Sequence, residues 1–483
     1  MSHRTDLWRL LAGLLSLPLL SMWLVPLVDT SEPRYAEISR LMAQTGDWIT
    51  PWFEPGLPFW GKPPLSFWAQ AISFKLLGVH EFAARLPSWL ATLGTVGLLS
   101  AYTNSYFCRR TAQWAAIIYV SCGLVYVASG AVLTDPFLTL GTTWSMTAFT
   151  MAQRKPTWVW RYGFFIGLAI GLLAKGPLVL VLVAGPLVGW LLWHPSARQN
   201  FRSLPWGRGV LLTLALSVPW YVLAELKTPG FLNYFIIGEH FLRFIEPDWH
   251  GDLYGTAHKR AYGTIWGYWL VAAFPWSILA LGGIIHGVFK ADSRAKLPRI
   301  LKDPTLCYLF AWALFPPVFF TLSGNILLTY VLPALAPFSI LMAALLNDGQ
   351  QEVPRFARSA YIAVCIVPIA VLILTVVTLL RPMSLKTERD LVQYVQRKTS
   401  GGQRLFYLDS RPFSARFYSR GTAEVVSMDQ LPATLMGPEP IYLAIPKDLL
   451  DEAKRMLTTP VHKEFENRRH VLIEINPNTQ RAR

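Results

Sequence analysis

Charged side chains recur beside long apolar stretches of this sequence, where a charge is costly unless it is paired or functional. The first such segment, Asp29-Thr-Ser-Glu-Pro-Arg-Tyr-Ala-Glu37, follows directly on the first apolar run. Asp29 and Glu32 are carboxylates of the kind that accepts a proton from a hydroxyl group during group transfer. Because Glu32 stands before Pro33, it is also a good helix start, so a capping role remains open beside the catalytic one.

A second group of residues has the chemistry of an anion site. It consists of basic residues and one tyrosine: Arg34, Lys62, Lys175, Arg243 and Tyr330. Cations and hydrogen-bond donors on dry walls bind phosphate strongly. Asp135, next to Pro136, is a third candidate carboxylate, and Glu239 and His240 are candidate contacts for an acceptor or a metal.

Each of these residues also has a structural alternative. Lys175 could simply extend to the lipid headgroups, and Asp135 before Pro136 could cap a helix. His240 is more often a hydrogen-bonded interfacial side chain than a metal ligand, and Tyr330 alone fits an aromatic belt. The functional interpretation depends on all of them lying on one side of a membrane.

The elements that must position these residues are membrane helices. Of the 483 residues, 53% are hydrophobic and only 15% are charged, which favours a polytopic membrane protein. The four cysteines lack metal-ligand spacing, so a zinc finger or a disulfide framework is not expected. About eleven apolar runs are long enough, or nearly so, to cross a bilayer: 7–28, 82–102, 112–133, 136–152, 158–174, 177–193, 209–224, 264–289, 305–322, 326–346 and 360–380.

Basic residues predict the orientation of these spans. With the N-terminus in the cytoplasm, every short loop assigned to the inside carries Lys or Arg, as the positive-inside rule requires. The formal net charge of +15 is thereby largely explained, so no nucleic-acid partner is expected. The first apolar run lacks a small-residue cleavage site, and we interpret it as a retained span.

The outer face then receives two long loops, 29–81 and 225–263, and a C-terminal domain, 381–483, beyond a transmembrane domain of residues 1–380. In the first loop, a helix with Glu37 and Arg40 on its polar face and a second helix over 65–77 are expected to lie in the membrane interface. The C-terminal residues predict strands at 405–408, 423–426, 441–445 and 471–475 and helices at 389–397 and 449–457. This alternation predicts a small α/β domain with an accessory or docking role.

Ordered motifs across residues 7–346 resemble the membrane glycosyltransferases of the GT-C class. The nearest resemblance is to the branch that contains bacterial aminoarabinose transferases of lipid A and protein O-mannosyltransferases. The motifs are Glu32-Pro-Arg-Tyr-Ala-Glu-Ile38, Gly46-Asp-Trp48, Gly61-Lys-Pro-Pro-Leu65, Leu133-Thr-Asp-Pro136, Ala174-Lys-Gly-Pro177, Pro219-Trp-Tyr221, Glu239-His240 with Arg243, and Thr329-Tyr-Val-Leu-Pro333.

The resemblance implies an enzyme of the bacterial inner membrane that takes a sugar from a polyprenyl phosphate, usually undecaprenyl phosphate. The acceptor, on the outer face, would be lipid A, another glycolipid or polysaccharide, or a protein. A carboxylate at the reaction centre corresponds to Asp29 or Glu32, with Asp29 preferred because capping already explains Glu32. A second acid corresponds to Asp135, and the donor phosphate would be held by Lys62, Lys175, Arg243 and Tyr330.

The sequence also departs from the family pattern. Ser31 and Glu32 stand where the aminoarabinose enzymes have adjacent Asp and Glu, Gly61 replaces a frequent Glu, and Ile326-Leu-Leu328 lacks a frequent basic residue. These differences argue against assigning aminoarabinose and lipid A as the substrates. No cofactor is assigned, and a divalent metal is left open. The alternative function is a transporter or flippase of lipid-linked sugars, which inverted repeats would favour, but no convincing repeat is found.

Overall fold

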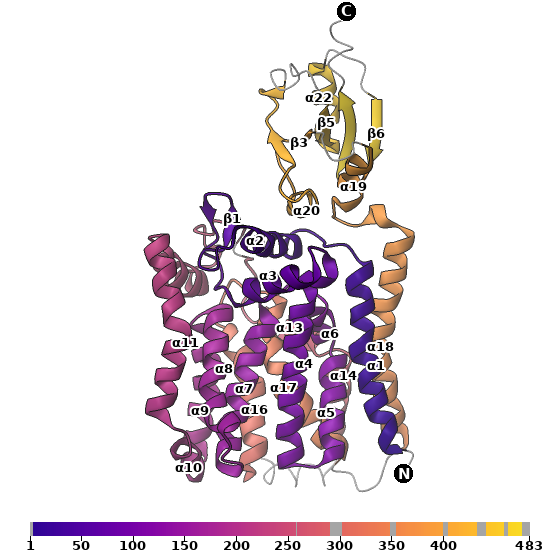
Figure 1. Cartoon of the computed structure of the whole chain (residues 1–483). Helices are drawn as coiled ribbons and strands as arrows, with labels where there is room; N and C mark the ends of the chain where they lie inside the picture. Colours follow the sequence, from indigo (N-terminus) through magenta and orange to yellow (C-terminus); the bar gives the residue numbers. More distant parts are fainter. Residues whose placement is uncertain are drawn as a thin grey trace, which may run out of the picture.

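The computed structural model of the chain describes residues 3–256, 258–289, 302–347, 354–398, 404–431, 441–457 and 462–475. A bundle of long helices carries two short helices across one end and a small sheet domain beyond them (Figure 1). The predicted class, a membrane all-α protein with interfacial helices and a small C-terminal α/β domain, is confirmed. The N-terminus and the sheet domain lie at opposite ends of the bundle (Figure 1).

Each predicted apolar run coincides with a helix or with a broken pair of helical segments. The bounds are α1 (His3–Leu24), α4 (Glu81–Tyr106), α5 (Arg109–Ser121) with α6 (Gly123–Ser129), α7 (Asp135–Arg154), α8 (Trp158–Lys175), α9 (Leu178–Trp193), α11 (Trp206–Lys227), α13 (Thr264–Ala272) with α14 (Trp276–Phe289), α16 (Pro304–Phe320), η3 (Leu328–Ala334) with α17 (Leu335–Asn347), and α18 (Pro354–Leu380).

The number of spans stays a prediction. Within the described ranges, four helices are long and apolar enough to cross a membrane, or six if each bent pair forms one span. The bends measure 73° between α5 and α6 and 109° between α13 and α14. Pro275 stands at the second bend, where its missing N–H cannot continue a helix. The short helices α9 and α16 are also apolar.

The close packing of α7 against α8 positions two of the predicted site residues. A Cβ atom at Gly141 would lie 2.6 Å from the carbonyl oxygen of Gly167, so only glycine permits this approach. Asp135 is the first residue of α7, and Lys175 is the last residue of α8. Because the two helices run antiparallel in contact, these side chains meet at the same end of the bundle.

The short helices across the outer end are α2 (Ser31–Thr45) and α3 (Leu65–Leu77), with a small hairpin of β1 (Trp52–Glu54) and β2 (Leu57–Pro58) between them. Glu37 and Arg40, which the sequence places on the polar face of α2, are not exposed to solvent. They are 3% and 6% exposed, and they pair with each other at 2.7 Å. The physical reason is that α20 (Phe413–Tyr418) of the C-terminal domain packs on α2.

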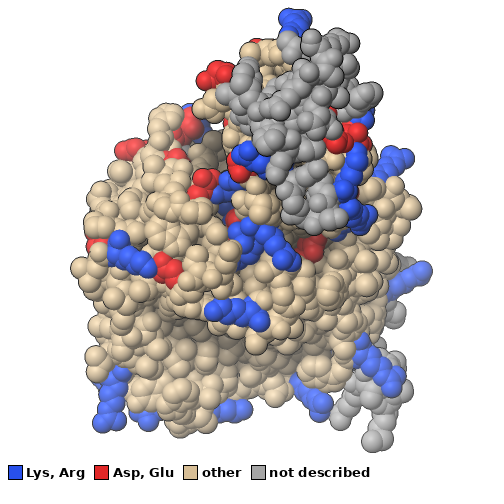
Figure 2. Space-filling view, turned by 45° about the horizontal axis from the view of Figure 1, so that its top comes forward, with Lys and Arg blue, Asp and Glu red and all other residues tan. Residues whose placement is uncertain are grey.

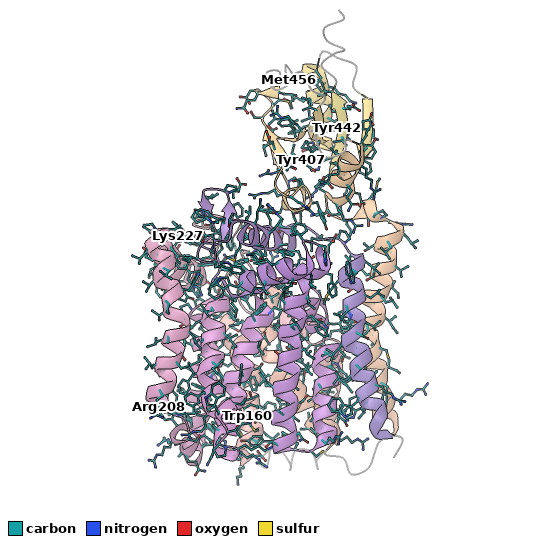
Figure 3. The ribbon with its side chains drawn as sticks, viewed as in Figure 1. Trp160, Arg208, Lys227, Tyr407, Tyr442 and Met456 are labelled. Atoms are coloured by element: carbon teal, nitrogen blue, oxygen red, sulfur yellow. The ribbon has the colours of Figure 1, made fainter. Side chains whose placement is uncertain are left out.

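The C-terminal domain is a five-stranded sheet of order β4-β3-β5-β7-β6, with β4, β3 and β5 parallel and β7 antiparallel to β5. Tyr407 and Tyr442, labelled in Figure 3, are buried in its core. The bounds are α19 (Arg389–Lys398), β3 (Arg404–Leu408), β4 (Glu424–Val426), β5 (Ile441–Pro446), α22 (Leu450–Met456), β6 (His462–Glu466) and β7 (His470–Ile475). The predicted strands and helices are present, whereas β6 and α20 were not predicted.

Basic residues gather at the end of the bundle away from the sheet domain. Figure 2 shows blue side chains along the lower edge of the surface, with no red side chain among them in that view. Figure 3 labels Arg208 at this end of α11 and Lys227 at the other end. Residues 290–301 and 348–353 of the predicted inner loops 290–304 and 347–359 fall outside the described residues.

Candidate active site

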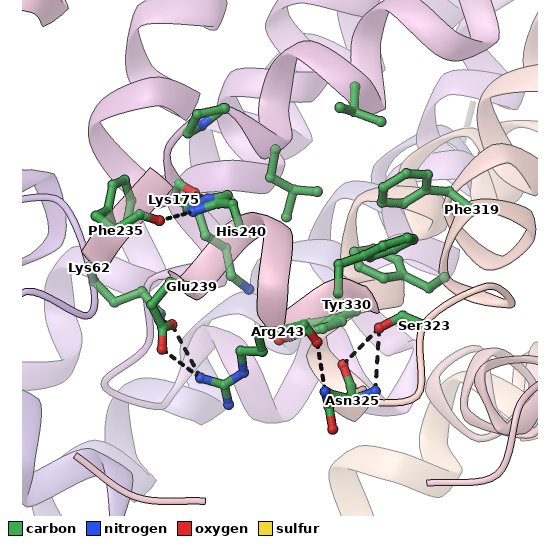
Figure 4. A pocket seen from close by; sticks show the side chains of 15 residues that line it. Lys62, Lys175, Phe235, Glu239, His240, Arg243, Phe319, Ser323, Asn325 and Tyr330 are labelled. Carbon is green, nitrogen blue, oxygen red and sulfur yellow. Dashed lines mark hydrogen bonds and ion pairs between the residues drawn. The ribbon is translucent and has the colours of Figure 1, made fainter. Parts of the chain in front are cut away.

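A cavity of about 160 Å³ lies where the end of α8, the second outer loop and η3 meet (Figure 4). One part of its wall is polar or charged, with Lys62, Lys175, Glu239, His240, Arg243, Ser323, Asn325 and Tyr330. The other part is apolar, with Pro177, Leu178, Val181, Phe235, Phe244, Phe319 and Phe320. Six of the residues singled out from the sequence therefore share one cavity, although they come from distant segments.

Lys175 forms a buried ion pair with Asp135 at this cavity. The Lys175 ammonium also lies 4.7 Å from the centre of the Tyr330 ring, a cation–π arrangement. The chain turns sharply after Lys175 because Gly176 adopts φ 76°, and a Cβ there would lie 2.7 Å from the Phe235 ring. Asp135 thus contacts the cavity through Lys175, without lining it.

Glu239 is the acid between the other two cations. Its carboxylate lies 3.2 Å from the Lys62 ammonium and 2.9 Å from the Arg243 guanidinium. Burial would raise the pKa of Glu239, but Lys62 and Arg243 outweigh burial and lower that pKa. Burial is the largest single influence on the pKa of Lys62 and acts to lower it, but the Glu239 carboxylate, together with Tyr35 and Tyr330, raises that pKa overall. All three groups are therefore held in their charged forms.

Glu239 and His240 lie in η2 (Asn233–Leu242), a π-helix, and Arg243 begins the short helix α12 (Arg243–Ile245). The two ring nitrogens of His240 lie 2.8 Å from the Phe235 carbonyl oxygen and 2.9 Å from the Lys175 carbonyl oxygen. Burial lowers the pKa of His240, and these carbonyl oxygens oppose that effect. His240 therefore ties η2 to the end of α8, the structural alternative open from the sequence.

A divalent metal finds no ready ligand set here. Both ring nitrogens of His240 already face carbonyl oxygens, so neither is directed into the cavity as a free lone pair. Across the described ranges, no group of three His, Cys, Asp or Glu side chains is arranged to hold a metal ion.

Asn325 and Asp252 are site residues that the sequence did not indicate. The amide of Asn325 donates to the carbonyl oxygens of Arg243 and Glu246, both at 2.6 Å. Asp252 pairs with the Arg243 guanidinium at 3.2 Å. Arg243 is thus held at its backbone and at both terminal nitrogens, since Nη2 donates to the Thr256 carbonyl oxygen at 3.4 Å. Its buried Nε has no hydrogen-bond partner in the part of the chain that is described.

Arg34, predicted to hold the donor phosphate, does not line the cavity. Its guanidinium donates to the Tyr254 carbonyl oxygen at 2.7 Å and lies 5.2 Å from the centre of the Tyr35 ring. Phe413 of the C-terminal domain covers it, at 5.7 Å from the ring centre. Arg34 therefore supports the loop that carries Asp252 instead of reaching the cavity itself.

Asp29, the catalytic carboxylate preferred from the sequence, also lies outside the cavity. Its side chain is 3% exposed and accepts hydrogen bonds from the backbone N–H of Ser414 at 2.9 Å and from Arg469 at 2.6 Å. Both partners belong to the C-terminal domain. Asp29 stands at the N-terminus of α20 in the position of a helix cap. The structure thus gives Asp29 an interdomain contact.

Glu32 is also committed to a structural contact. Arg85 binds both of its carboxylate oxygens, at 2.9 and 2.8 Å, and the backbone N–H of Val132 donates to it at 3.0 Å. The same guanidinium donates to the carbonyl oxygens of Val25 at 2.6 Å and Pro26 at 3.0 Å, beyond the end of α1. The predicted capping of its own helix is not observed, since α2 has no side-chain cap. Glu32 instead joins α1, α4 and the turn before α7.

Known proteins share both sequence and fold with this chain. Residues 10–235 match the family described as dolichyl-phosphate-mannose-protein mannosyltransferase. An undecaprenyl phosphate-alpha-4-amino-4-deoxy-L-arabinose arabinosyl transferase of Aeromonas hydrophila is 31% identical over 360 residues, which cover 72% of this chain and 62% of that protein. The protein of the same name from Shewanella sediminis is 32% identical over 330 residues, covering 67% and 57%. The matched region thus spans about three fifths of these curated relatives.

The crystal structure of ArnT from Cupriavidus metallidurans bound to undecaprenyl phosphate has the same fold, with a TM-score of 0.77 at 19% identity over 96% of this chain and 97% of that one. Its apo structure gives the same TM-score, over 99% of each chain. Fold and sequence together define a membrane protein of the GT-C class. Within that class, the chain is similar in sequence to the aminoarabinose transferases and protein mannosyltransferases, as its motifs predict.

Proposed function

We propose that this protein is a glycosyltransferase that moves a sugar from a polyprenyl phosphate, such as undecaprenyl phosphate, to an acceptor at the outer face of the bacterial inner membrane. One observation carries the proposal: Lys62, Lys175, Arg243 and Tyr330 converge on a cavity whose remaining wall is apolar. The polar part suits the sugar-linked phosphate, and the apolar part suits the first units of the isoprenoid chain. The names of the related transferases agree with this donor class.

The apolar wall continues onto a surface of the bundle that is suited to lipid. Val181 of α9 lines the cavity and is 37% exposed, and its neighbour Leu180 is 43% exposed. On the other side of the wall, Phe244 stacks on Phe319 of α16, with ring centres 4.8 Å apart. A polyprenyl chain lying here would remove its own apolar surface and that of the protein from water, at roughly 25 cal/mol per Å².

The proposed reaction is a single in-line displacement at the anomeric carbon. The bond from that carbon to the phosphate oxygen breaks, its electron pair stays on the phosphate, and the acceptor oxygen forms the new bond with inversion. The phosphate carries one negative charge as a diester and a second as the released monoester. Lys62, Lys175 and Arg243 stabilise this developing charge without a proton having to be supplied.

The carboxylates divide by their contacts. Of Asp29, Glu32 and Asp135, only Asp135 contacts a residue that lines the cavity, and that residue is Lys175. We therefore keep Asp135 as an acid of the site that positions Lys175, and we assign Asp29 and Glu32 to holding the outer elements together. Tyr330 completes the phosphate site, while Arg34 supports the loop that carries Asp252 and does not contact the phosphate. Lipid A, another glycolipid or polysaccharide, and a protein remain the acceptor classes.

The orientation is part of the proposal. The N-terminus is cytoplasmic, residues 1–380 form the transmembrane domain, and residues 381–483 form a periplasmic domain. The opposite placement of the two ends and the basic rim away from the sheet domain support this topology (Figures 1 and 2). The cavity then faces the periplasm, where a lipid-linked donor and its acceptor meet.

Mass spectrometry of envelope glycolipids and glycoproteins from a deletion strain tests the proposal. We expect one sugar modification to disappear and to return with the wild-type gene but not with Lys62→Met. Purified protein in nanodiscs should transfer that sugar from its undecaprenyl phosphate to the acceptor so identified. Unchanged glycans, or movement of the intact donor across the bilayer without transfer, would contradict it.

A further inference from the structure

We propose that Glu239 is the built-in counter-ion of the phosphate site and, once the donor phosphate has taken its cations, the base that accepts the proton of a hydroxyl acceptor. This inference rests on the proposed function and deepens it, because it names the acceptor class as a hydroxyl. It also supplies the proton acceptor that neither Asp29 nor Glu32 is placed to provide.

The first argument is the position of Glu239 between two cations that come from separate outer loops. Lys62 belongs to the first loop and Arg243 to the second, and both point their charges at this one carboxylate (Figure 4). The Glu239 side chain is only 5% exposed, so it fills the place that an anionic ligand would need. A phosphate entering the cavity must therefore compete with Glu239 for the same donors.

The second argument is that Glu239 is the acid of this cluster most easily released. Asp252 accepts a backbone hydrogen bond from the Tyr254 N–H at 2.9 Å, which fixes it in its turn. Asp135 begins α7, where the helix dipole favours a fixed negative charge. Among the described residues, the carboxylate of Glu239 has hydrogen bonds with side chains only: Lys62, Arg243 and the Tyr234 hydroxyl at 3.3 Å. Side chains can turn toward a phosphate without unfolding a backbone element.

The third argument is electrostatic. Burial acts to raise the pKa of Glu239, and only Lys62 and Arg243 hold that pKa below its usual range. When Lys62 and Arg243 turn to the phosphate, their positive charge is shared between the phosphate and Glu239, while burial still acts to raise the pKa of Glu239. The carboxylate then becomes more basic at the moment when an acceptor hydroxyl needs a base.

The complete step conserves charge and atoms. The acceptor oxygen bonds to the anomeric carbon, and its proton passes to a Glu239 carboxylate oxygen. The bond from the anomeric carbon to the phosphate oxygen breaks, leaving the second negative charge on the polyprenyl phosphate beside Lys62 and Arg243. When that product leaves, the cations return to Glu239 and its proton is released to water.

The test compares Glu239→Gln with Glu246→Gln, an exposed acid of the same segment, in nanodiscs containing the sugar donor that the wild type uses. For Glu239→Gln we expect tighter binding of undecaprenyl phosphate, because the competing charge is gone, and a fall in kcat of about 100-fold or more. Glu246→Gln should match the wild type in both. An unchanged kcat would overturn the role as base, and weaker binding would overturn the role as counter-ion.

A pH profile guards against a Glu239→Gln variant that fails to fold. At saturating donor, the wild-type rate should fall as pH decreases and the base becomes protonated, and Glu239→Asp should move the midpoint of that fall. Other titratable and charged groups also face Glu239, namely Lys62, Arg243, Tyr234, His240 and Tyr254. The shift of the midpoint in the Glu239→Asp variant therefore assigns the fall in rate to residue 239. A profile that is flat, or identical in both proteins, would contradict the proposal.

The two proposals fail in different ways. If the wild type neither binds undecaprenyl phosphate nor transfers a sugar from any polyprenyl phosphate, the proposed function fails. If the wild type does both and Glu239→Gln transfers equally well, only the role of Glu239 fails.

Discussion

Two clusters of buried charge lie at the same end of this molecule, and they differ in what surrounds them. In the first, Lys62, Glu239 and Arg243 face a cavity. In the second, Asp29 meets Arg469, which also binds Glu388, and this cluster is closed between the helix bundle and the C-terminal domain. Both clusters pair acids with basic side chains, but of the two only the first faces a cavity that leaves room for a ligand.

The partners of each acid explain the difference. Asp29 accepts a backbone N–H from Ser414, and Glu388, which is fully buried, also accepts from Asn467 at 2.7 Å. Contacts of this kind fix an acid within a folded domain. Glu239 depends on the long side chains of Lys62 and Arg243, which come from separate loops. A buried charge therefore indicates a ligand site when its partners can turn away and a space adjoins it.

The largest expected effect falls on the open cluster. Lys62→Met removes a cation from the phosphate site but leaves Glu239 paired with Arg243, so the fold should persist. We expect the rate of sugar transfer to fall about 100- to 1,000-fold, measured with labelled donor in nanodiscs. Lys259→Met, at a side chain 61% exposed, is the matched control and should keep its activity. An equal loss of transfer activity in both variants would contradict a specific role for the cavity lysine.

The next effect concerns stability and the contact of Glu32. Arg85→Met leaves this acid without its bidentate partner and removes donors from the carbonyl oxygens of Val25 and Pro26. Breaking a buried pair costs about 3–5 kcal/mol, so we expect a clearly lower unfolding temperature in detergent. Molecules that remain folded at low temperature should still transfer sugar. A stable but inactive Arg85→Met protein would instead indicate that Glu32 has a role in the reaction.

A smaller effect concerns the closed cluster and pH. Burial acts to raise the pKa of Glu388, but His470 and Arg469 outweigh it and lower that pKa below 4.5. The stabilisation is therefore present above pH 4.5 and is lost as pH falls through the lowered value. We expect the hydrogen-exchange protection factors of α19 and β7, corrected for the intrinsic exchange rate at each pH, to fall in that acidic range. Protection factors that are independent of pH would contradict this.

Asp29→Asn should lower the protection factors of α20 at neutral pH and change transfer only slightly.

The smallest effect is expected at Tyr330. Tyr330→Phe keeps the ring 4.7 Å from the Lys175 ammonium and removes only the hydroxyl. We expect the donor KM to rise by a few-fold with little change in kcat, since a neutral hydrogen bond contributes about 1 kcal/mol. Steady-state kinetics against donor concentration measures this. A large fall in kcat would give the hydroxyl a part in the reaction itself.

Much of the site was predictable because it follows from helix ends. Lys175 ends one helix, Asp135 begins its neighbour and Tyr330 lies in η3, so their positions along the chain already placed them on one side of the membrane. The eleven helical runs follow from composition alone, since an apolar stretch must form helix in lipid. What periodicity does not reveal is a break such as that between α5 and α6.

The missed features depend on contacts between distant residues. Asp29 and Arg469 are 440 positions apart, and no local pattern marks either as the partner of the other. Asn325 follows Gly324 and resembles an ordinary turn residue, yet it holds the backbone carbonyl of Arg243 from 82 positions away. Strand β6 is rich in charge because it is the edge of its sheet, where charge is protective and hides the strand pattern.

The affinity for undecaprenyl phosphate in nanodiscs tests the central claim most directly, because it asks which cluster is the phosphate site. The dissociation constant would be measured for the wild type, Lys62→Met and Asp29→Asn. We expect Lys62→Met to weaken binding at least about tenfold, a loss of about 1.4 kcal/mol, and Asp29→Asn to equal the wild type. The reverse order, or equal affinity in all three proteins, would contradict the account.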